Sequence, residues 1–348
     1  MTLFSVLDRS PVRRDGGPAR ALRDTVAFAR DIERLGYHRF WVSEHHGVPG
    51  VAGSAPTVLA AAVAGATGRI RVGTGGVMLP NHRPLVVAEQ FGVLEALHPG
   101  RIDMGLGRSV GFTAGVRDAL GHGKDAADGF GAQLRELLGF FTGEHAFPGV
   151  HAYPAEGLRV PPFLLATGSG ADLAAELGLP LVIAPVRGER ALAEAVTRYR
   201  EGFRPSEWAR EPYVVVSTAI AVADSAADAR NLLVPEAWAT VYSRSHGVFP
   251  PLAPPAEILA LPMTGRERTR LEETLDGQIS GTPAEVADRL DALVETTGAD
   301  EVLATTAAYD QSARLDSFAA LAELSGIVSP VTAGSASSRE QTGYPAEP

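Results

Sequence analysis

Short aliphatic segments alternate with longer segments of helical spacing along this sequence, and that alternation limits the folds open to the chain. Strands that alternate with helices favour a parallel sheet covered by helices. The number of strand-like segments favours an α/β protein with a closed (β/α)8 TIM barrel over the alternative, an open doubly wound sheet. We predict one such barrel domain over residues 1–330, with strands at 3–7, 39–43, 70–74, 102–106, 163–166, 181–184, 214–220 and 302–306.

The predicted helices between these strands have recognisable ends. An apolar stripe at helical spacing runs from Leu22 to Leu35 and stops at Gly36. Pro84 stands at the start of another helix, where proline is tolerated because its missing N–H has no helical partner. The segment Thr282–Glu285 has the sequence of a capping box and predicts the start of a third helix.

Two segments interrupt this rhythm. Residues 110–128 are rich in Gly, Ala and Asp and predict a loop after the fourth strand. Residues 246–282 hold several prolines and charges and predict a long insertion between strands seven and eight. Loops on that face of a barrel build active sites, so we expect a mobile lid there, with a surface insertion as the alternative. The Ser-, Thr-, Gly- and Pro-rich residues 331–348 are expected to form a disordered C-terminal tail.

The charge and cysteine content exclude several classes of partner and chemistry. The chain has 31 basic and 41 acidic residues, a net charge of −10, which argues against nucleic acid and anionic membranes as partners. With no cysteine, it has neither a cysteine nucleophile nor a thiolate metal site. No apolar run approaches the roughly 20 residues needed to cross a bilayer, and the apolar start is too short for a signal peptide, so we expect a cytoplasmic protein.

One predicted helix is apolar on every side. Residues 54–67 consist mostly of Ala, Val and Leu. A helix of that kind must be covered all round. Burial against a second copy of the chain would achieve this, which predicts a homodimer, and burial under neighbouring helices is the alternative.

Three ionisable residues follow the second predicted strand. Glu44, His45 and His46 come directly after an apolar run, which on a barrel places them at the catalytic mouth. Successive side chains of a strand point to opposite faces, so only one histidine can face the barrel. A neutral imidazole there could hydrogen-bond a cofactor or act as an acid or base, and holding a loop is the alternative. A zinc site would need more ligands than this strand end supplies, so we predict no metal.

Two further strand ends carry residues suited to a flat or anionic ligand. Gly73, Gly75 and Gly76 would let a ligand approach the backbone, although a tight turn or bulge explains them equally well. They are not a dinucleotide-binding fingerprint, because that motif must open a helix. The fourth strand is followed by a single arginine, Arg108, whose guanidinium suits a phosphate, with an ion pair to a nearby acid as the alternative.

A small polar loop leads into a helix after the fifth strand. It consists of Thr167, Gly168, Ser169 and Gly170. The free N–H groups and the dipole at the start of a helix favour an anion, and the two hydroxyls add further donors. Helix capping without a ligand is the alternative, since general barrel rules place phosphate sites after later strands.

Taken together and in this order, these segments resemble the bacterial luciferase-like flavin monooxygenases. The resemblance runs from Leu3 to about Leu324 and is densest over Trp41–Arg108. It implies a (β/α)8 barrel that binds flavin mononucleotide (FMN) or, in some branches, the deazaflavin coenzyme F420. No single motif carries the resemblance, because each is weak alone and only the ordered set is specific.

The resemblance assigns expected roles residue by residue. His45 matches the active-site histidine, and Gly75 and Gly76 match a pair whose peptide bond is cis in several members and lies against the flavin ring. Arg108 matches the arginine on the flavin phosphate, and the loop that grips this phosphate matches Thr167, Gly168, Ser169 and Gly170. This loop departs from the Gly-Ser-Ser-Gly of similar members. Phe112 is a positional candidate for an aromatic that faces the substrate.

The activity implied is that of a two-component monooxygenase. A separate flavin reductase would supply reduced FMN, and the barrel would use it with O2 to hydroxylate or epoxidise an organic substrate, or to oxidise a carbonyl compound. Tailoring of a secondary metabolite is the expected setting. The alternatives are an F420-dependent hydride-transfer enzyme and a flavin-binding subunit without turnover, and the presence of His45 argues against the second.

Overall fold

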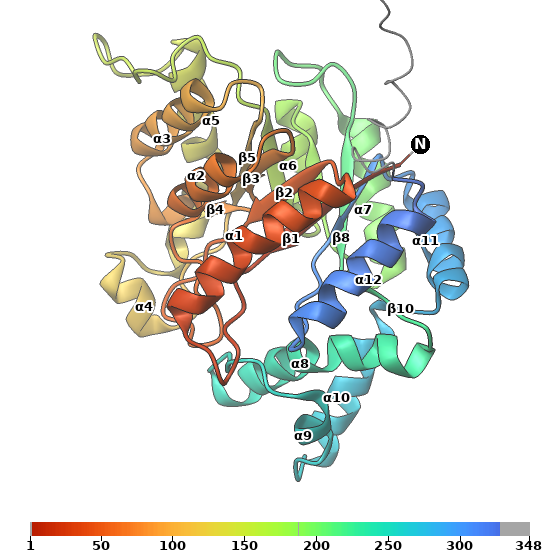
Figure 1. Cartoon of the computed structure of the whole chain (residues 1–348). Coiled ribbons are helices and arrows are strands. Elements are labelled where there is room, and N and C mark those ends of the chain that lie inside the picture. Colours follow the sequence, from red (N-terminus) through yellow and green to blue (C-terminus); the bar gives the residue numbers. More distant parts are fainter. Residues whose placement is uncertain (1, 187, 328–348) are drawn as a thin grey trace, which may run out of the picture.

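The chain folds into a closed parallel barrel, shown by a computed structural model that describes residues 2–186 and 188–327 (Figure 1). One sheet of nine strands has the order β3-β2-β1-β11-β8-β7-β6-β5-β4, and pairing of β3 with β5 closes it. The short β4 (Val77–Met78) is an extra strand, which leaves eight in the barrel. They are β1 (Leu3–Asp8), β2 (Arg39–Val42), β3 (Arg71–Thr74), β5 (Ile102–Gly107), β6 (Pro162–Ala166), β7 (Leu181–Ile183), β8 (Val214–Thr218) and β11 (Glu301–Ala304).

Helices surround the strands, and the helix ends expected from the sequence are confirmed. Gly36 ends α1 with φ 91°, a left-handed conformation that glycine adopts without steric cost. Pro84 begins α3, and Thr282 with Glu285 forms the capping box of α11. The surrounding helices are α1 (Pro18–Leu35), α2 (Pro56–Ala66), α3 (Pro84–Leu97), α5 (Phe130–Thr142), α6 (Gly170–Leu177), α7 (Glu189–Gly202), α11 (Pro283–Thr297) and α12 (Gln311–Leu324).

The apolar core has two main layers. A large cluster of buried residues, among them Phe40, Phe91 and Phe318, packs the strands against the helices. A smaller cluster takes one buried residue from each of six strands and fills the inside of the barrel: Leu7, Trp41, Phe163, Val182, Val215 and Leu303. This is the filled interior expected of a barrel of this size, so ligands must bind at an end of the barrel.

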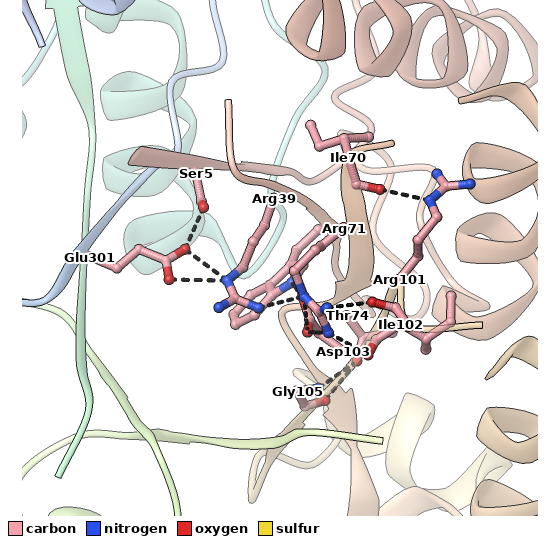
Figure 2. Close-up of polar contacts among 12 residues, drawn as sticks. Ser5, Arg39, Ile70, Arg71, Thr74, Arg101, Ile102, Asp103, Gly105 and Glu301 are labelled. Carbon is pink, nitrogen blue, oxygen red and sulfur yellow. Dashed lines mark hydrogen bonds and ion pairs between the residues drawn. The ribbon is translucent and has the colours of Figure 1, made fainter. Parts of the chain in front are cut away.

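Buried charges join the strands at their N-terminal ends (Figure 2). Arg39 donates to Glu301 through Nε at 3.0 Å and to Asp103 through Nη1 at 2.9 Å. Arg71 donates to Asp103 through Nη2 at 2.6 Å, and Ser5 donates to Glu301. The network therefore links β1, β2, β3, β5 and β11 at the end of the barrel where residues serve stability rather than catalysis.

The segment 110–128, expected to be a loop, contains helical structure. The helix α4 (Ala114–Ala119) begins at Thr113, whose side chain accepts a hydrogen bond from the Val116 N–H. A 3-10 turn, η2 (Lys124–Gly129), leads into α5. The loop prediction was wrong here because a side-chain cap can stabilise a short helix in a segment rich in glycine.

The insertion between the last two barrel strands is present and folds into packed helices. It includes α8 (Ala226–His246), α9 (Pro255–Leu259), α10 (Gly265–Asp276) and β10 (Ile279–Gly281), which pairs with β9 (Ile220–Val222). The helices enclose their own apolar cluster, with Leu233, Trp238 and Leu271 buried. They gather at one end of the molecule, the end where α4 also lies (Figure 1).

Backbone hydrogen bonds hold the insertion on the loops that follow β1 and β2. The N–H of Leu252 donates to the carbonyl of Val12 at 2.8 Å, and the N–H of Gly50 donates to Phe249 at 2.9 Å. The insertion therefore lies beside the C-terminal ends of these strands. Among the described helices, none has the length and apolar character that crossing a bilayer requires. The expected tail, 331–348, lies outside the described residues.

Candidate active site

The structure places the predicted site residues at one end of the barrel. His45 follows β2, Gly75 and Gly76 follow β3, Arg108 follows β5, and the Thr167–Gly170 loop follows β6. Because all barrel strands are parallel, these positions share the C-terminal mouth. What the sequence could not supply is how the side chains are arranged there.

Arg108 and the loop after β6 line a common pocket of about 270 Å³. The pocket lies between the ends of β5 and β6 and includes Ser169 and Gly170 at the start of α6. Arg108 is exposed and has no hydrogen bond or ion pair with any residue in the described part of the chain. The alternative of a structural ion pair therefore has no support, although Asp128 lines the same pocket.

The loop before α6 leaves the hydroxyls of Thr167 and Ser169 without a hydrogen bond among the described residues, whereas three N–H groups at the start of the helix donate to carbonyls of the loop at 3.2–3.4 Å. Ser169 stands at the N-cap, yet its side chain makes no capping hydrogen bond. Gly168 has φ 58°, a left-handed conformation that favours glycine. Thr167 and Ser169 are both exposed. With a guanidinium opposite and a helix N-terminus beside it, the pocket has the donors that a phosphate group requires. His45, Gly75 and Gly76 are not among its lining residues.

His45 has an environment that keeps its imidazole neutral. Burial lowers the pKa of His45 to about 4, and the positive charge of nearby Arg9 contributes to the shift. Nδ1 lies 3.2 Å from the Ser43 hydroxyl oxygen. In the tautomer in which Nδ1 accepts from Ser43, the proton is on Nε2 and can be donated to another group.

The two adjacent histidines face different surroundings, although β2 ends at Val42 and strand alternation therefore does not apply to them. His46 donates through Nε2 to Glu44 at 2.6 Å, whereas His45 contacts Ser43. His82, which follows the 3-10 turn η1 (Leu79–Asn81), donates to the same Glu44 oxygen at 2.8 Å.

Sequence reasoning missed His82, which lies 38 residues from Glu44 along the chain. No short-range motif connects the two, so only the fold could reveal the contact. The prediction of no metal assumed that no further histidine reaches this strand end. Glu44, His46 and His82 in fact bring ligand-type atoms within 4.8 Å of one another. Each imidazole also lies within hydrogen-bond distance of the Glu44 carboxylate, to which a protonated Nε2 can donate.

Gly75 and Gly76 are joined by a cis peptide bond, as the resemblance implied. A Cβ atom at Gly75 would come within 2.8 Å of the Leu7 side chain, and one at Gly76 would come equally close to the Gly105 carbonyl oxygen. Packing against the backbone of Gly105 therefore requires a glycine at position 76, whereas the Leu7 side chain near Gly75 can shift. That a ligand also lies against this pair stays a prediction.

Arg9 and Phe112 complete the mouth. The Arg9 guanidinium forms an ion pair with Glu236 of α8, which ties the insertion to the end of β1. Phe112, the positional candidate for a substrate contact, is 57% exposed in the segment before α4. It does not line the pocket of Arg108.

The sequence matches one family model and many curated proteins. The model described as luciferase-like monooxygenase matches residues 2–301. The uncharacterized protein YvbT of Bacillus subtilis is 40% identical over 325 residues, covering 93% of this chain and 96% of the relative. A luciferase-like monooxygenase of Escherichia coli K12 is 37% identical over 317 residues, covering 90% of this chain and 94% of that protein. The N-acetyl-S-alkylcysteine monooxygenase of B. subtilis is 39% identical over 214 residues, 59% of this chain and 64% of that protein.

Solved structures share the fold. Apo-MsnO8 superposes with a TM-score of 0.87 at 32% identity, covering 94% of this chain and all of the other. The oxygenating constituent of 3,6-diketocamphane monooxygenase from Pseudomonas putida, in complex with FMN, has a TM-score of 0.70 at 20% identity, with coverage of 95% and 100%. An F420-dependent secondary alcohol dehydrogenase has a TM-score of 0.69 at 16% identity, covering 91% of this chain and 97% of the other.

Proposed function

Because this chain belongs to the luciferase-like monooxygenase family, we propose that it is an FMN-dependent two-component monooxygenase. The observation that carries the proposal is the shared pocket of Arg108, Ser169 and Gly170. An unpaired guanidinium opposite a helix N-terminus fits the phosphate of FMN, since both groups favour negative charge.

The protein's own contribution is to bind, orient and shield. When bound, reduced flavin supplies the two electrons with which O2 gives one oxygen atom to the substrate and the other to water. Arg108 and the loop before α6 hold the phosphate. His45, neutral at physiological pH, donates or accepts a proton at Nε2 beside the reacting group. The insertion, held on the mouth by Arg9 and by the backbone at Leu252, limits the access of water.

Two partners belong to the proposal. Reduced FMN comes from a separate reductase, because the described residues form the barrel and its insertion and include no dinucleotide-binding unit.

A second copy of the chain covers α2 and α3. Apolar side chains on these helices are exposed, among them Val58 at 69% and Leu97 at 66%. Beside them lies an apolar groove between α1 and α2, and a homodimer would bury this surface.

Binding of the cofactor is the first test. Titration of the protein with FMN and with F420, followed by fluorescence, should give clearly tighter binding of FMN. Preference for F420 would instead support hydride transfer, the second activity present on this fold.

Turnover is the second test. We expect reduced FMN and isotopically labelled O2 to transfer one labelled atom to an organic probe, for which an N-acetyl-S-alkylcysteine is the first choice because a relative is named for that substrate. Tight FMN binding without oxygen transfer to thioether, ketone or aromatic probes would support the flavin-binding subunit.

A further inference from the structure

We propose that Glu44 is a positioning residue that fixes the histidine end of β2, the Gly75–Gly76 turn and the Arg108 end of β5 relative to one another. This inference rests on the proposed function, because it takes those three elements to be the ones that face the cofactor. None of the roles assigned from the sequence involves Glu44.

The contacts of Glu44 reach two segments of the mouth. Its side chain is fully buried, and Oε2 accepts a hydrogen bond from the Met78 N–H at 2.9 Å. Oε1 accepts from Nε2 of His46 and of His82, and the Asn81 amide lies 3.4 Å away. One carboxylate therefore joins the residue next to His45 with the stretch that follows Gly75 and Gly76.

The link continues from Met78 to the phosphate pocket. Met78 belongs to β4, and its partner in the parallel ladder with β5 is Gly107. Gly107 directly precedes Arg108, which lines the pocket. Three contacts therefore connect the histidine end of β2 with the phosphate pocket. Glu44 hydrogen-bonds Met78, Met78 pairs with Gly107 in the sheet, and Gly107 is the chain neighbour of Arg108.

The chemistry of Glu44 makes this link stiff. Burial alone would raise the pKa of Glu44, but hydrogen bonds from His82, His46 and the Met78 amide outweigh burial and lower it. A buried carboxylate without a Lys or Arg partner depends on such donors, and losing one leaves charge unsatisfied. Any displacement of the Met78 segment breaks a charge-assisted hydrogen bond, which is about twice as strong as a neutral one.

Glu33 offers a matched control near the N-terminal end of β3, whereas Glu44 acts beyond the C-terminal end of that strand. Its Oε1 accepts hydrogen bonds from the N–H groups of Gly68, Arg69 and Ile70, just before β3. Like Glu44, it is a carboxylate that holds backbone amides next to β3. It lies away from the mouth, so its loss should affect stability without affecting the cofactor.

The experiment compares Glu44→Gln with Glu33→Gln in the full-length protein. The amide in Glu44→Gln would keep one acceptor oxygen but would replace the other with a donor that faces the donors of His46, His82 or Met78. We expect Glu44→Gln to weaken FMN binding by about tenfold, to lower kcat more than it changes the substrate KM, and to alter the visible circular dichroism of bound FMN. We expect Glu33→Gln to change only the melting temperature.

The outcomes separate this inference from the proposed function. If the wild-type protein fails to bind FMN, the proposed function is wrong and this inference falls with it. If the wild type binds FMN and Glu44→Gln matches Glu33→Gln in affinity, kcat and circular dichroism, Glu44 is only structural. Should Glu44→Gln not fold, His82→Ala takes its place, because it removes the donor of His82 and keeps the carboxylate. Unchanged FMN binding and kcat in that variant would overturn the inference.

Discussion

At the scale of single residues, the surroundings of His45 decide its protonation. Burial, assisted by Arg9, lowers its pKa to about 4, below the usual histidine value of 6.5. The folded protein therefore keeps a neutral imidazole down to about pH 4. The unfolded chain binds that proton below about pH 6.5, so this group costs folding stability as the pH falls between these two values.

Replacing His45 should separate chemistry from cofactor binding. We expect His45→Ala to bind FMN as the wild type does and to form product about 100- to 10,000-fold more slowly, the usual range for a lost acid or base. The wild-type rate should not fall near pH 6.5 on account of His45, and its acid limb should lie near pH 4. Steady-state rates across pH test both statements, and unchanged turnover in His45→Ala would refute the role.

Residue identities at the mouth were partly predictable from the sequence. The resemblance implied that Arg108 and Ser169 meet at one phosphate, and they line one pocket. The contact of Glu44 with His82 was not predictable, because it depends on how the segment after β3 turns back toward β2. The packing demand on Gly75 and Gly76 also depends on neighbours that only the closed barrel brings close.

At the scale of elements, Arg39 links strands that are distant in the sequence. It is buried at the start of β2 between Asp103 of β5 and Glu301 of β11. Burial alone would lower the pKa of Arg39, but these two carboxylates raise it. Removing the Arg39 guanidinium would leave the buried carboxylates of Asp103 and Glu301 without the cation that they share.

We therefore expect Arg39→Met to lower the free energy of unfolding by about 3–5 kcal/mol, the usual cost of breaking a buried ion pair. Denaturant titration measures this, with Arg190→Met as the control. The Arg190 side chain is 93% exposed on α7, and losing its solvent-screened pair with Glu194 should leave the free energy of unfolding nearly unchanged. Equal losses in the two variants would show that the buried network does not stabilise the barrel.

Elements with strong local signals were predicted well, and irregular segments were not. Gly36, Pro84 and the Thr282–Glu285 capping box mark helix ends through their own backbone chemistry, and all three hold. Between residues 246 and 282, prolines and charges suggested a mobile lid and gave no sign of helices. The helices there are stabilised by apolar contacts with α8, for instance through Leu271, and such contacts leave little local signature.

At the scale of the whole molecule, the exposed apolar face of α2 and α3 supports the proposed homodimer. We expect light scattering to give twice the chain mass for the wild type, and the mass of one chain for Val58→Glu, because a buried charge without a partner disfavours association. Leu261→Glu, on the insertion, is the control and should remain a dimer. A wild-type protein that scatters as a single chain would contradict the homodimer.

The binding of FMN compared with riboflavin by Arg108→Ala tests the central claim most directly, since the two ligands differ only in the phosphate. Isothermal titration should show FMN binding about 10- to 100-fold more weakly than to the wild type, with riboflavin affinity unchanged and with Arg190→Ala as the control. Equal losses for both ligands, or no loss for FMN, would contradict the account by showing that Arg108 does not hold the phosphate.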